Sequence, residues 1–230
     1  MSLACATCPV RDSAACAVLS EDERSALAAL GRTRAIKRGE TLFAAGEDAA
    51  ACATLVSGAL KVSAYDEEGD ERILALIHPA GFAGELFQPF AHYDVTALSD
   101  STLCTFSQKD MEAAIERFPA LGGALLRRSQ EDLHAARGLL SLTTRRDAKS
   151  RIAVLILGLA QAASDSPCHP AARFDLPLTR GEIANLAGLT IETVSRRLTQ
   201  LEAEGVITRE GARGIALSDP ARLKAIAGSI

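Results

Sequence analysis

The stretch LTRGEIANLAGLTIETVSRRLTQLEAEGVITREGARGIALSD (residues 178–219) contains two short helical patterns separated by a glycine. Thr179 is suited to cap the first helix and Thr190 the second, because a threonine hydroxyl accepts a hydrogen bond from a backbone amide of the first turn. Gly188 interrupts the pattern between them. Two helices joined by a short glycine-containing turn form a helix–turn–helix, whose second helix enters the major groove of DNA. The stretch therefore predicts a DNA-binding unit.

The second helix of this unit has two different faces. Its apolar face carries Val194, Leu198 and Leu201 at helical spacing, and we expect these residues to be buried. Its polar face carries Glu192, Ser195, Arg196 and Thr199. Arg196 can donate two hydrogen bonds to guanine, and Glu192 can accept one from cytosine N4, so we predict contacts with bases. The alternative is a surface ion pair between these two residues.

Further side chains of this region are predicted to contact the DNA backbone. The residues that follow the second helix, GVITREGARGIAL (205–217), form a strand, a glycine-rich turn and a strand, as the wing of such a domain does. Phosphate contacts are expected from Thr179, Arg180, Thr190, Arg197 and Arg213, and Arg209 is a further candidate. The alternative for each of these is an ordinary solvated polar side chain.

Residues 33–108 carry a β pattern instead. Short runs such as TLVSGALKVSAY (54–65) are separated by glycines suited to turns. Many short strands with glycine turns indicate an antiparallel sandwich or barrel. In front of this region, Ser20 and Glu23 have capping-box spacing, which predicts a short helix over residues 20–30.

A helical pattern begins at Pro119 and continues to about residue 163. Its residues Leu126, Ser129, Leu133, Ala136 and Leu140 follow alternating spacings of three and four. This stripe is typical of a helix that packs along a partner helix. We therefore predict a homodimer formed through Leu126, Leu133, Ala136 and Leu140. The alternative is a helix that packs on its own β domain.

The chain has six cysteines, and three of them, Cys5, Cys8 and Cys16, lie near its start. We expect a cytoplasmic protein, because no secretory signal is recognisable and the longest apolar run, IAVLILGLAQAA (152–163), is too short to span a bilayer. In a reducing compartment, metal binding or redox chemistry is favoured over structural disulfides. The net charge of −4 means that any DNA-binding surface must be locally basic.

Over nearly its whole length the chain resembles the CRP/FNR family of transcription regulators. KRGETLFAAGED (37–48) and SGALKVSAYDEEGDERILALIHPAGFAGE (57–85) resemble the family's β-roll. LTIETVSRRLTQL (189–201) carries the E-x-x-S-R arrangement of the FNR branch. The resemblance implies an α+β fold: an N-terminal antiparallel β-roll of the cyclic-nucleotide-binding, jelly-roll type, a long dimerisation helix and a C-terminal winged helix–turn–helix.

The expected parts of the chain follow from this resemblance. They are a cysteine cluster-binding segment (1–19), a β-roll sensor domain (20–118), the dimerisation helix (119–148) and the DNA-binding domain (149–230). The resemblance implies a regulator in which a [4Fe–4S] cluster promotes dimerisation and binding to palindromic DNA related to TTGAT-N4-ATCAA. Oxygen would destroy the cluster and release the DNA. RNA polymerase is a further expected partner.

The family's pattern of cluster ligands implies Cys5, Cys8, Cys16 and Cys104 in this chain. The spacing C-x2-C-x7-C has a longer second gap than in the best-known member. Each iron of such a cluster takes one terminal thiolate, which is why four cysteines are needed. Structural zinc and a thiol redox switch are the alternatives for these residues. Cys52 is expected to be a small buried residue, and Cys168 a loop residue without a ligand role.

Binding of cAMP is not expected. Gly84, Glu85 and Leu86 keep a fragment that lies near the ribose in nucleotide-binding members, but AHYDVTALSD (91–100) has no arginine for the phosphate, and Asp94 would repel it. An enzyme is not expected either, because the four histidines are scattered and no nucleophile elbow is present. The alternatives that stay open are a constitutive DNA-binding regulator and one gated by a small molecule in the β-roll.

Overall fold

The computed structural model describes residues 5–144, 147–164, 166 and 168–228. These residues divide into two compact units, of which the first runs to Ala136 and the second begins at Arg137. The division falls within the long helix α3 (Pro119–Thr144). No helix in the described part of the chain combines the length and the apolar character needed to cross a membrane.

The first unit begins with what we call the cysteine segment, residues 5–19. It contains two short 3-10 helices, η1 (Cys5–Thr7) and η2 (Ala15–Val18), and leads into α1 (Glu21–Leu30). The predicted capping box of α1 is confirmed: Glu23 N–H donates to Ser20 Oγ, and Ser20 N–H donates to Glu23 Oε2 at 2.9 Å. The helix therefore begins where the sequence predicts.

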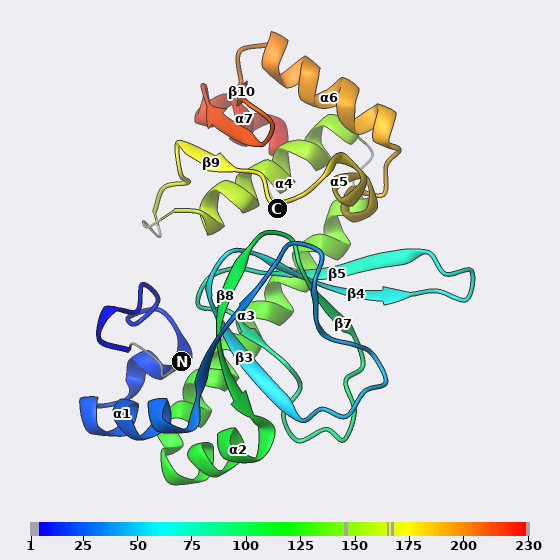
Figure 1. Cartoon of the computed structure of the whole chain (residues 1–230). Coiled ribbons are helices and arrows are strands. Elements are labelled where there is room, and N and C mark those ends of the chain that lie inside the picture. Colours follow the sequence, from blue (N-terminus) through cyan, green and yellow to red (C-terminus); the bar gives the residue numbers. More distant parts are fainter. Residues whose placement is uncertain (1–4, 145–146, 165, 167, 229–230) are drawn as a thin grey trace. The chain divides into compact units, whose positions relative to one another are not determined.

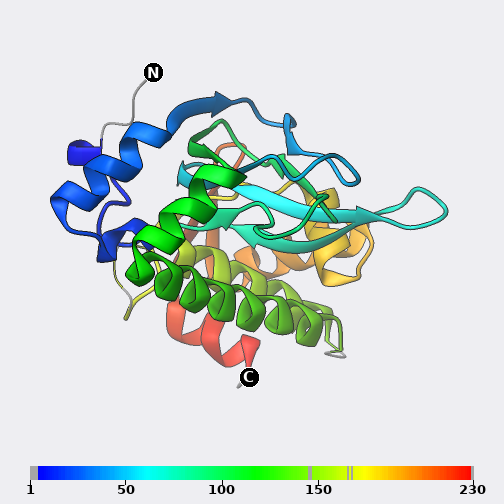
Figure 2. The same cartoon turned by 90° about the horizontal axis from the view of Figure 1, so that it is seen from below.

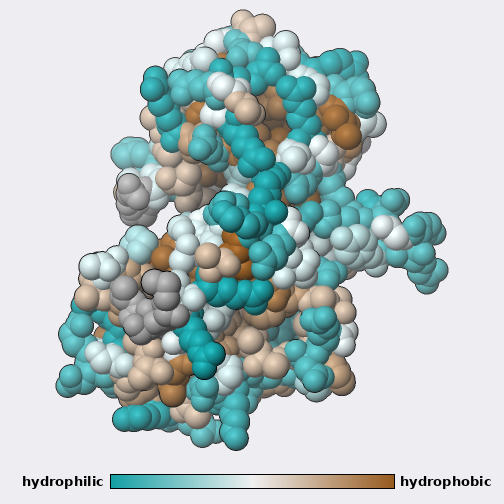
Figure 3. Space-filling model, viewed as in Figure 1, coloured by the Kyte–Doolittle hydropathy of each residue, from teal (hydrophilic) through white to brown (hydrophobic). Residues whose placement is uncertain are grey.

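A β-roll follows α1, as expected, and its two sheets share one apolar core (Figure 1). Its strands are β1 (Arg32–Ile36), β2 (Thr41–Phe43), β3 (Ala51–Ser57), β4 (Leu60–Tyr65), β5 (Glu71–Ile77), β6 (Phe82–Ala83), β7 (Asp94–Ala97) and β8 (Ser101–Ser107). One sheet has the order β1-β8-β3-β6 and the other β2-β7-β4-β5. Leu55, Leu60 and Leu103 lie fully buried in the shared core. The hairpin of β4 and β5 ends in the hydrophilic turn 66–70, whose surface is teal in Figure 3.

The helices α2 (Gln108–Arg117) and α3 close this unit. Phe118 and Leu121 join Leu27 of α1 and Phe106 of β8 in a second apolar cluster. Cys52 belongs to the same cluster and is fully buried, as predicted. Figures 1 and 2 both show the cysteine segment and α1 beside the first part of α3. The start of α3 is thus packed against both the β-roll and the N-terminal segment.

The second unit contains the end of α3 and the C-terminal helices and strands. These are α4 (Ala148–Ala162), β9 (Arg173–Asp175), α5 (Arg180–Ala187), α6 (Ile191–Ala203), β10 (Ile207–Glu210), β11 (Gly214–Leu217) and α7 (Pro220–Ala227). The helical pattern expected up to residue 163 forms two helices, and Asp147 caps the second by accepting from the amides of Lys149 and Ser150. The predicted wing is the β10–β11 hairpin, extended by β9, which was not predicted, to a three-stranded sheet.

Helices α5 and α6 form the predicted helix–turn–helix. Thr179 caps α5 within a capping box, and Thr190 caps α6 by accepting from Thr193 N–H. Gly188 ends α5 in the left-handed conformation with φ 59°, which an L residue with a Cβ atom adopts only under strain. The apolar faces are buried as expected, with Val194, Leu198 and Leu201 inside the unit.

Candidate DNA interface and cysteine site

The predicted base-contacting residues lie on the outer side of α6. Glu192 and Arg196 are exposed, and Ser195 is half-buried. The Arg196 guanidinium donates to Thr193 Oγ1 at 3.3 Å. The pKa of the Glu192 carboxyl lies below its usual range because its own backbone N–H and the Thr190 hydroxyl donate to it, while the charge of Arg196 contributes least. Glu192 is therefore ionised at neutral pH and can accept a hydrogen bond from a base.

Several of the residues predicted to contact phosphate lie at the surface near these side chains. Arg180, at the start of α5, donates from Nη1 to Ser195 Oγ at 3.0 Å, which brings the beginning of α5 next to the outer face of α6. Thr179 and Thr190 are exposed at the starts of the two helices. Arg213 is exposed in the turn of the wing.

Two other arginines of this unit have partners within the protein. Arg197 is half-buried and donates from Nη1 to Gln200 Oε1 at 2.8 Å. Arg209 donates from Nε to Glu202 Oε2 at 2.8 Å, and this ion pair neutralises its charge. A contact with phosphate stays a prediction for Arg197, whose bond to Gln200 uses only one of its guanidinium donors.

The predicted dimer stripe is exposed along α3. Leu126, Leu133 and Leu140 are 63%, 43% and 71% exposed, and Ala136 is half-buried. The residues of α3 that pack on the β-roll unit are others, Leu121 and Ala124, which are 2% and 7% exposed. Leu126 also borders a groove with Leu86 and Phe87 of the β-roll unit, so both the dimer face and packing on the β domain stay predictions for this stripe.

The four cysteines implied as cluster ligands line one cavity. Cys5, Cys8 and Cys16 of the cysteine segment and Cys104 of β8 all border a space of about 40 Å³, enough for a few water molecules. Among the described residues, no group of three or more histidine, cysteine or acidic side chains is already gathered closely enough to hold a metal ion. The donor set of four thiols in apolar surroundings nevertheless fits the chemistry of an iron–sulfur cluster.

The charges of these thiols are coupled. Burial, helped by the neighbouring thiols of Cys8, Cys5 and Cys16, raises the pKa of Cys104 to about 12. Burial also raises the pKa values of Cys5 and Cys16, again with help from neighbouring cysteines. The thiols of Cys5, Cys16 and Cys104 are therefore protonated at neutral pH in the metal-free protein, and binding of a metal would release their protons.

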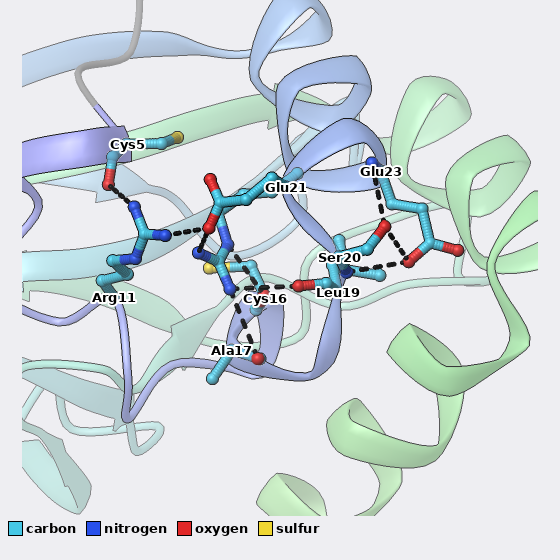
Figure 4. A network of polar contacts seen from close by, with 9 residues as sticks. Cys5, Arg11, Cys16, Ala17, Leu19, Ser20, Glu21 and Glu23 are labelled. Carbon is cyan, nitrogen blue, oxygen red and sulfur yellow. Dashed lines mark hydrogen bonds and ion pairs between the residues drawn. The ribbon is translucent and has the colours of Figure 1, made fainter.

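The polar residues that hold the cysteine segment escaped the sequence analysis. Arg24 of α1 is only 6% exposed, and its guanidinium donates to the carbonyl oxygens of Cys16, Ala17 and Leu19 at 3.1–3.4 Å. It also pairs with Glu21, which accepts from Arg11 as well (Figure 4). No sequence signal marks Arg24, because an arginine within the helix EDERSALAAL has the pattern of a solvated charge.

The β-roll has a second, larger cavity of about 230 Å³. Its lining includes the carboxylates of Glu47, Asp48 and Glu85. Glu85 accepts from His92 N–H at 3.0 Å, so it ties its own loop together, as expected. Asp94 does not line the cavity; it accepts from Ala45 N–H at 3.1 Å. A phosphate in this cavity would be repelled by Glu47, Asp48 and Glu85, and repulsion by Asp94 stays a prediction.

The comparisons with known proteins agree with this architecture. Residues 150–226 match the Crp-like helix-turn-helix domain, and residues 33–118 match the cyclic nucleotide-binding domain. The transcriptional activator protein FnrL of Cereibacter sphaeroides is 34% identical over 227 residues, which cover 97% of this chain and 92% of the relative. The chain belongs to the CRP/FNR family of transcription regulators.

Other members of the family are similar along most of their length. The nitrogen fixation regulation protein FixK of Bradyrhizobium diazoefficiens is 30% identical, with 98% of this chain and 94% of the relative covered. Among solved structures, FixK2 from Bradyrhizobium japonicum has a TM-score of 0.78 at 24% identity and covers 87% of this chain and 98% of its own. A CooA variant from Carboxydothermus hydrogenoformans has a TM-score of 0.69 at 20% identity, covering 89% of this chain and 90% of its own. At these identities the two structures establish the common fold.

Proposed function

We propose that this regulator responds to oxygen through a [4Fe–4S] cluster held by Cys5, Cys8, Cys16 and Cys104. One observation carries the proposal: these thiols come from two distant parts of the chain and line the same apolar cavity. Cys52 and Cys168 do not line it. When bound, the cluster would supply four iron–thiolate bonds, in a form that oxygen attacks.

The chain's own residues explain how the cysteine segment can influence dimerisation. Leu121 and Leu125 of α3 line the same cavity as the four thiols. A segment tied to Cys104 packs against this part of α3, whereas a released segment leaves it. Leu126, Leu133 and Leu140 on the same helix are exposed and would be buried by the α3 helix of a second copy. The order of the segment would thus favour the homodimer.

The dimer would then bind palindromic DNA. Two copies of α6 would enter successive major grooves about one helical turn apart. Glu192, Ser195 and Arg196 would contact bases, and Arg180 and Arg213 would contact phosphates. RNA polymerase would be the partner of the DNA-bound dimer at a promoter.

The central experiment is purification without air. We expect a coloured protein that contains iron and sulfide, sediments as a dimer and binds a palindromic site. After exposure to air the colour, the dimer and the DNA binding should be lost together. A colourless, iron-free protein that stays dimeric on DNA under both conditions would contradict the proposal. Zinc in the metal analysis would instead support a structural metal site.

Two cysteine variants provide a matched comparison. Cys104→Ala removes the thiol that β8 contributes to the cavity, while Cys168→Ala removes an exposed thiol outside it. We expect the first variant to lose its iron and the second to keep the wild-type content. Equal iron contents in the two variants would show that Cys104 is not a ligand.

A further inference from the structure

The cysteine segment has polar attachments of two kinds. Arg24 and Arg11 attach it to its own neighbourhood: Arg24 donates to three of its carbonyl groups, and Arg11 donates to Cys5 O at 3.4 Å and pairs with Glu21 (Figure 4). These bonds stay within the N-terminal part of the chain. They keep the segment joined to α1, but they do not reach the dimerisation helix.

One further hydrogen bond does reach that helix. Arg128 of α3 donates from Nη2 to the carbonyl oxygen of Ser13, in the middle of the segment, at 2.8 Å. Its Nη1 pairs with Glu131 at 2.9 Å, and the side chain is 25% exposed. The Ser13 carbonyl therefore accepts a hydrogen bond from a guanidinium group that is mostly buried.

The position of Arg128 on α3 places this bond next to the predicted dimer face. Arg128, Leu125 and Leu126 border the same groove along α3. Leu125 also lines the cysteine cavity, and Leu126 belongs to the exposed stripe. Arg128 thus borders the same groove as one residue of the cysteine cavity, Leu125, and one residue of the predicted dimer face, Leu126.

Loss of the Ser13 carbonyl would change the conditions for burying the stripe. A charged donor whose acceptor has left needs water, and an apolar interface that closes over it withdraws that water. Dimerisation would then be opposed by an unsatisfied N–H donor at the edge of the interface, because the ion pair with Glu131 occupies Nη1 and leaves Nη2 without its acceptor. With the carbonyl in place, the donor is satisfied and the interface closes without this penalty.

We propose that Arg128 is the positioning residue that couples the cysteine segment to the dimer face of α3, through its hydrogen bond to Ser13. The inference rests on the proposed function, in which the cluster fixes the place of the segment. It adds the side chain through which the state of the segment reaches the helix. If Arg128 had only a structural role, its loss would weaken the dimer equally with the segment ordered and with the segment released. If Arg128 couples the two, its loss would change the difference in dimer affinity between these two states.

The neighbouring Arg127 offers a matched control, because it is an exposed arginine on the same helix. The dimer dissociation constant is measured by sedimentation for the wild type, Arg128→Ala, Arg127→Ala and Arg128→Lys, first without air and then after air. We expect Arg128→Ala to reduce the ratio of the two constants about tenfold. Arg127→Ala should keep the wild-type ratio, and Arg128→Lys, which retains one charged donor, should restore part of it. An unchanged ratio in Arg128→Ala overturns the inference.

Hydrogen exchange separates this inference from the proposed function. Ala14 N–H donates to Val10 O, and Ala17 N–H donates to Ala14 O, both at 2.9 Å, so these amides report the order of the segment. In protein purified without air, Arg128→Ala should speed their exchange at least several-fold, and Arg127→Ala should not. If the wild-type protein contained no iron, the proposed cluster would be ruled out. The comparison of Arg128→Ala with Arg127→Ala would still test the hydrogen bond between Arg128 and Ser13. Equal exchange in the two variants would overturn the inference with or without a cluster.

Discussion

Arginine side chains in this protein perform different tasks according to their surroundings. Arg24 is buried and holds backbone carbonyls, Arg209 is neutralised by Glu202, and Arg196 stays exposed on the outer face of α6. A guanidinium that is buried or paired with a carboxylate has less to offer DNA, because its charge is already neutralised or out of reach of solvent. Exposure therefore decides which of these residues can contact a base.

Replacement of Arg196 tests this at the level of one side chain. Arg196→Ala should weaken binding to the best palindrome by about 1–3 kcal/mol and relax the preference at a single base pair, because a bidentate contact to guanine is lost. Arg213→Ala, in the wing, should weaken binding to all sequences alike and reduce the salt dependence. Fluorescence anisotropy with a set of single-base variants of the site measures both. A uniform loss for Arg196→Ala would reassign that residue to phosphate.

The thiols differ in reactivity for the same reason of exposure. Burial, followed by the charge of Glu112, raises the pKa of Cys52 to about 12, while Cys168 is exposed. At pH 8 this raised pKa leaves a thiolate at Cys52 in only about one molecule in ten thousand, so iodoacetamide should leave Cys52 intact. Cys168 is exposed and should be labelled much faster. In urea, Cys52 should react as well, since unfolding removes the burial. Peptide mass mapping measures the two rates, and equal rates in the native protein would contradict the burial of Cys52.

Turns and helix faces are the features that matter at the scale of elements. The left-handed Gly188 fixes the angle between α5 and α6, and so presents the outer face of α6. Helix α3 has one buried face and a second apolar face, the stripe, that is exposed in the single chain. Both features follow from local sequence, and both can be tested without disturbing the core.

Replacing each of two glycines by alanine should change the free energy of unfolding in opposite directions. Gly188→Ala should lower the free energy of unfolding by about 1–2 kcal/mol, because a residue with a Cβ atom is strained at φ 59°. The added Cβ atom would not clash, since its nearest neighbours, Thr143 and Arg151, lie at 3.5–3.6 Å. Gly158→Ala, in an exposed position of α4 with no atom near the added Cβ, should raise it by about 0.5–1 kcal/mol. Chemical denaturation measures both. The same sign for the two variants would contradict the left-handed turn.

The stripe of α3 is tested by adding a charge to it. Leu133→Glu should raise the dimer dissociation constant at least about a hundredfold, because the interface loses an apolar contact from each copy and gains a charge that must be buried. The fold should survive, because Leu133 is 43% exposed in the single chain. His134→Glu adds the same charge to the adjacent exposed position and should change little. Sedimentation equilibrium compares the variants, and equal dissociation constants would move the interface elsewhere.

At the scale of the whole molecule, the proposed function requires two copies on one piece of DNA. The chain carries one helix–turn–helix, and a palindrome offers two half-sites. The net charge of −4 gives little general attraction to DNA, so we expect affinity to come from two correctly spaced recognition helices. Spacing is then as important as sequence.

Insertion of five base pairs between the half-sites tests this requirement. The insertion turns one half-site to the opposite side of the duplex, so affinity should fall to about that of a site with one scrambled half. The scrambled site serves as the control in the same titration. Undiminished affinity for the lengthened site would mean that the copies bind independently.

The features that the sequence predicted well are those encoded by near neighbours in the chain. The capping box of Ser20, the cap at Thr179, the break at Gly188 and the buried face of α6 each depend on residues within about four positions of one another. The strand β9 and the bond of Arg128 to Ser13 were not predicted. Strand β9 pairs with β11, and Arg128 bonds to Ser13, over long distances in the sequence. No local sequence pattern predicts such contacts.

The sequence by itself therefore determined most of the elements, the DNA-binding unit and the resemblance to the family, because hydrophobic period, caps and turns are local properties. It also pointed, through the family resemblance, to four cysteines. Only the tertiary structure decided that these four border one cavity, that Arg24 is buried beneath the segment that carries three of them, and that Arg128 connects this segment to α3. The physical reason is that burial and electrostatic partnership depend on which distant residues the packing of the chain brings together.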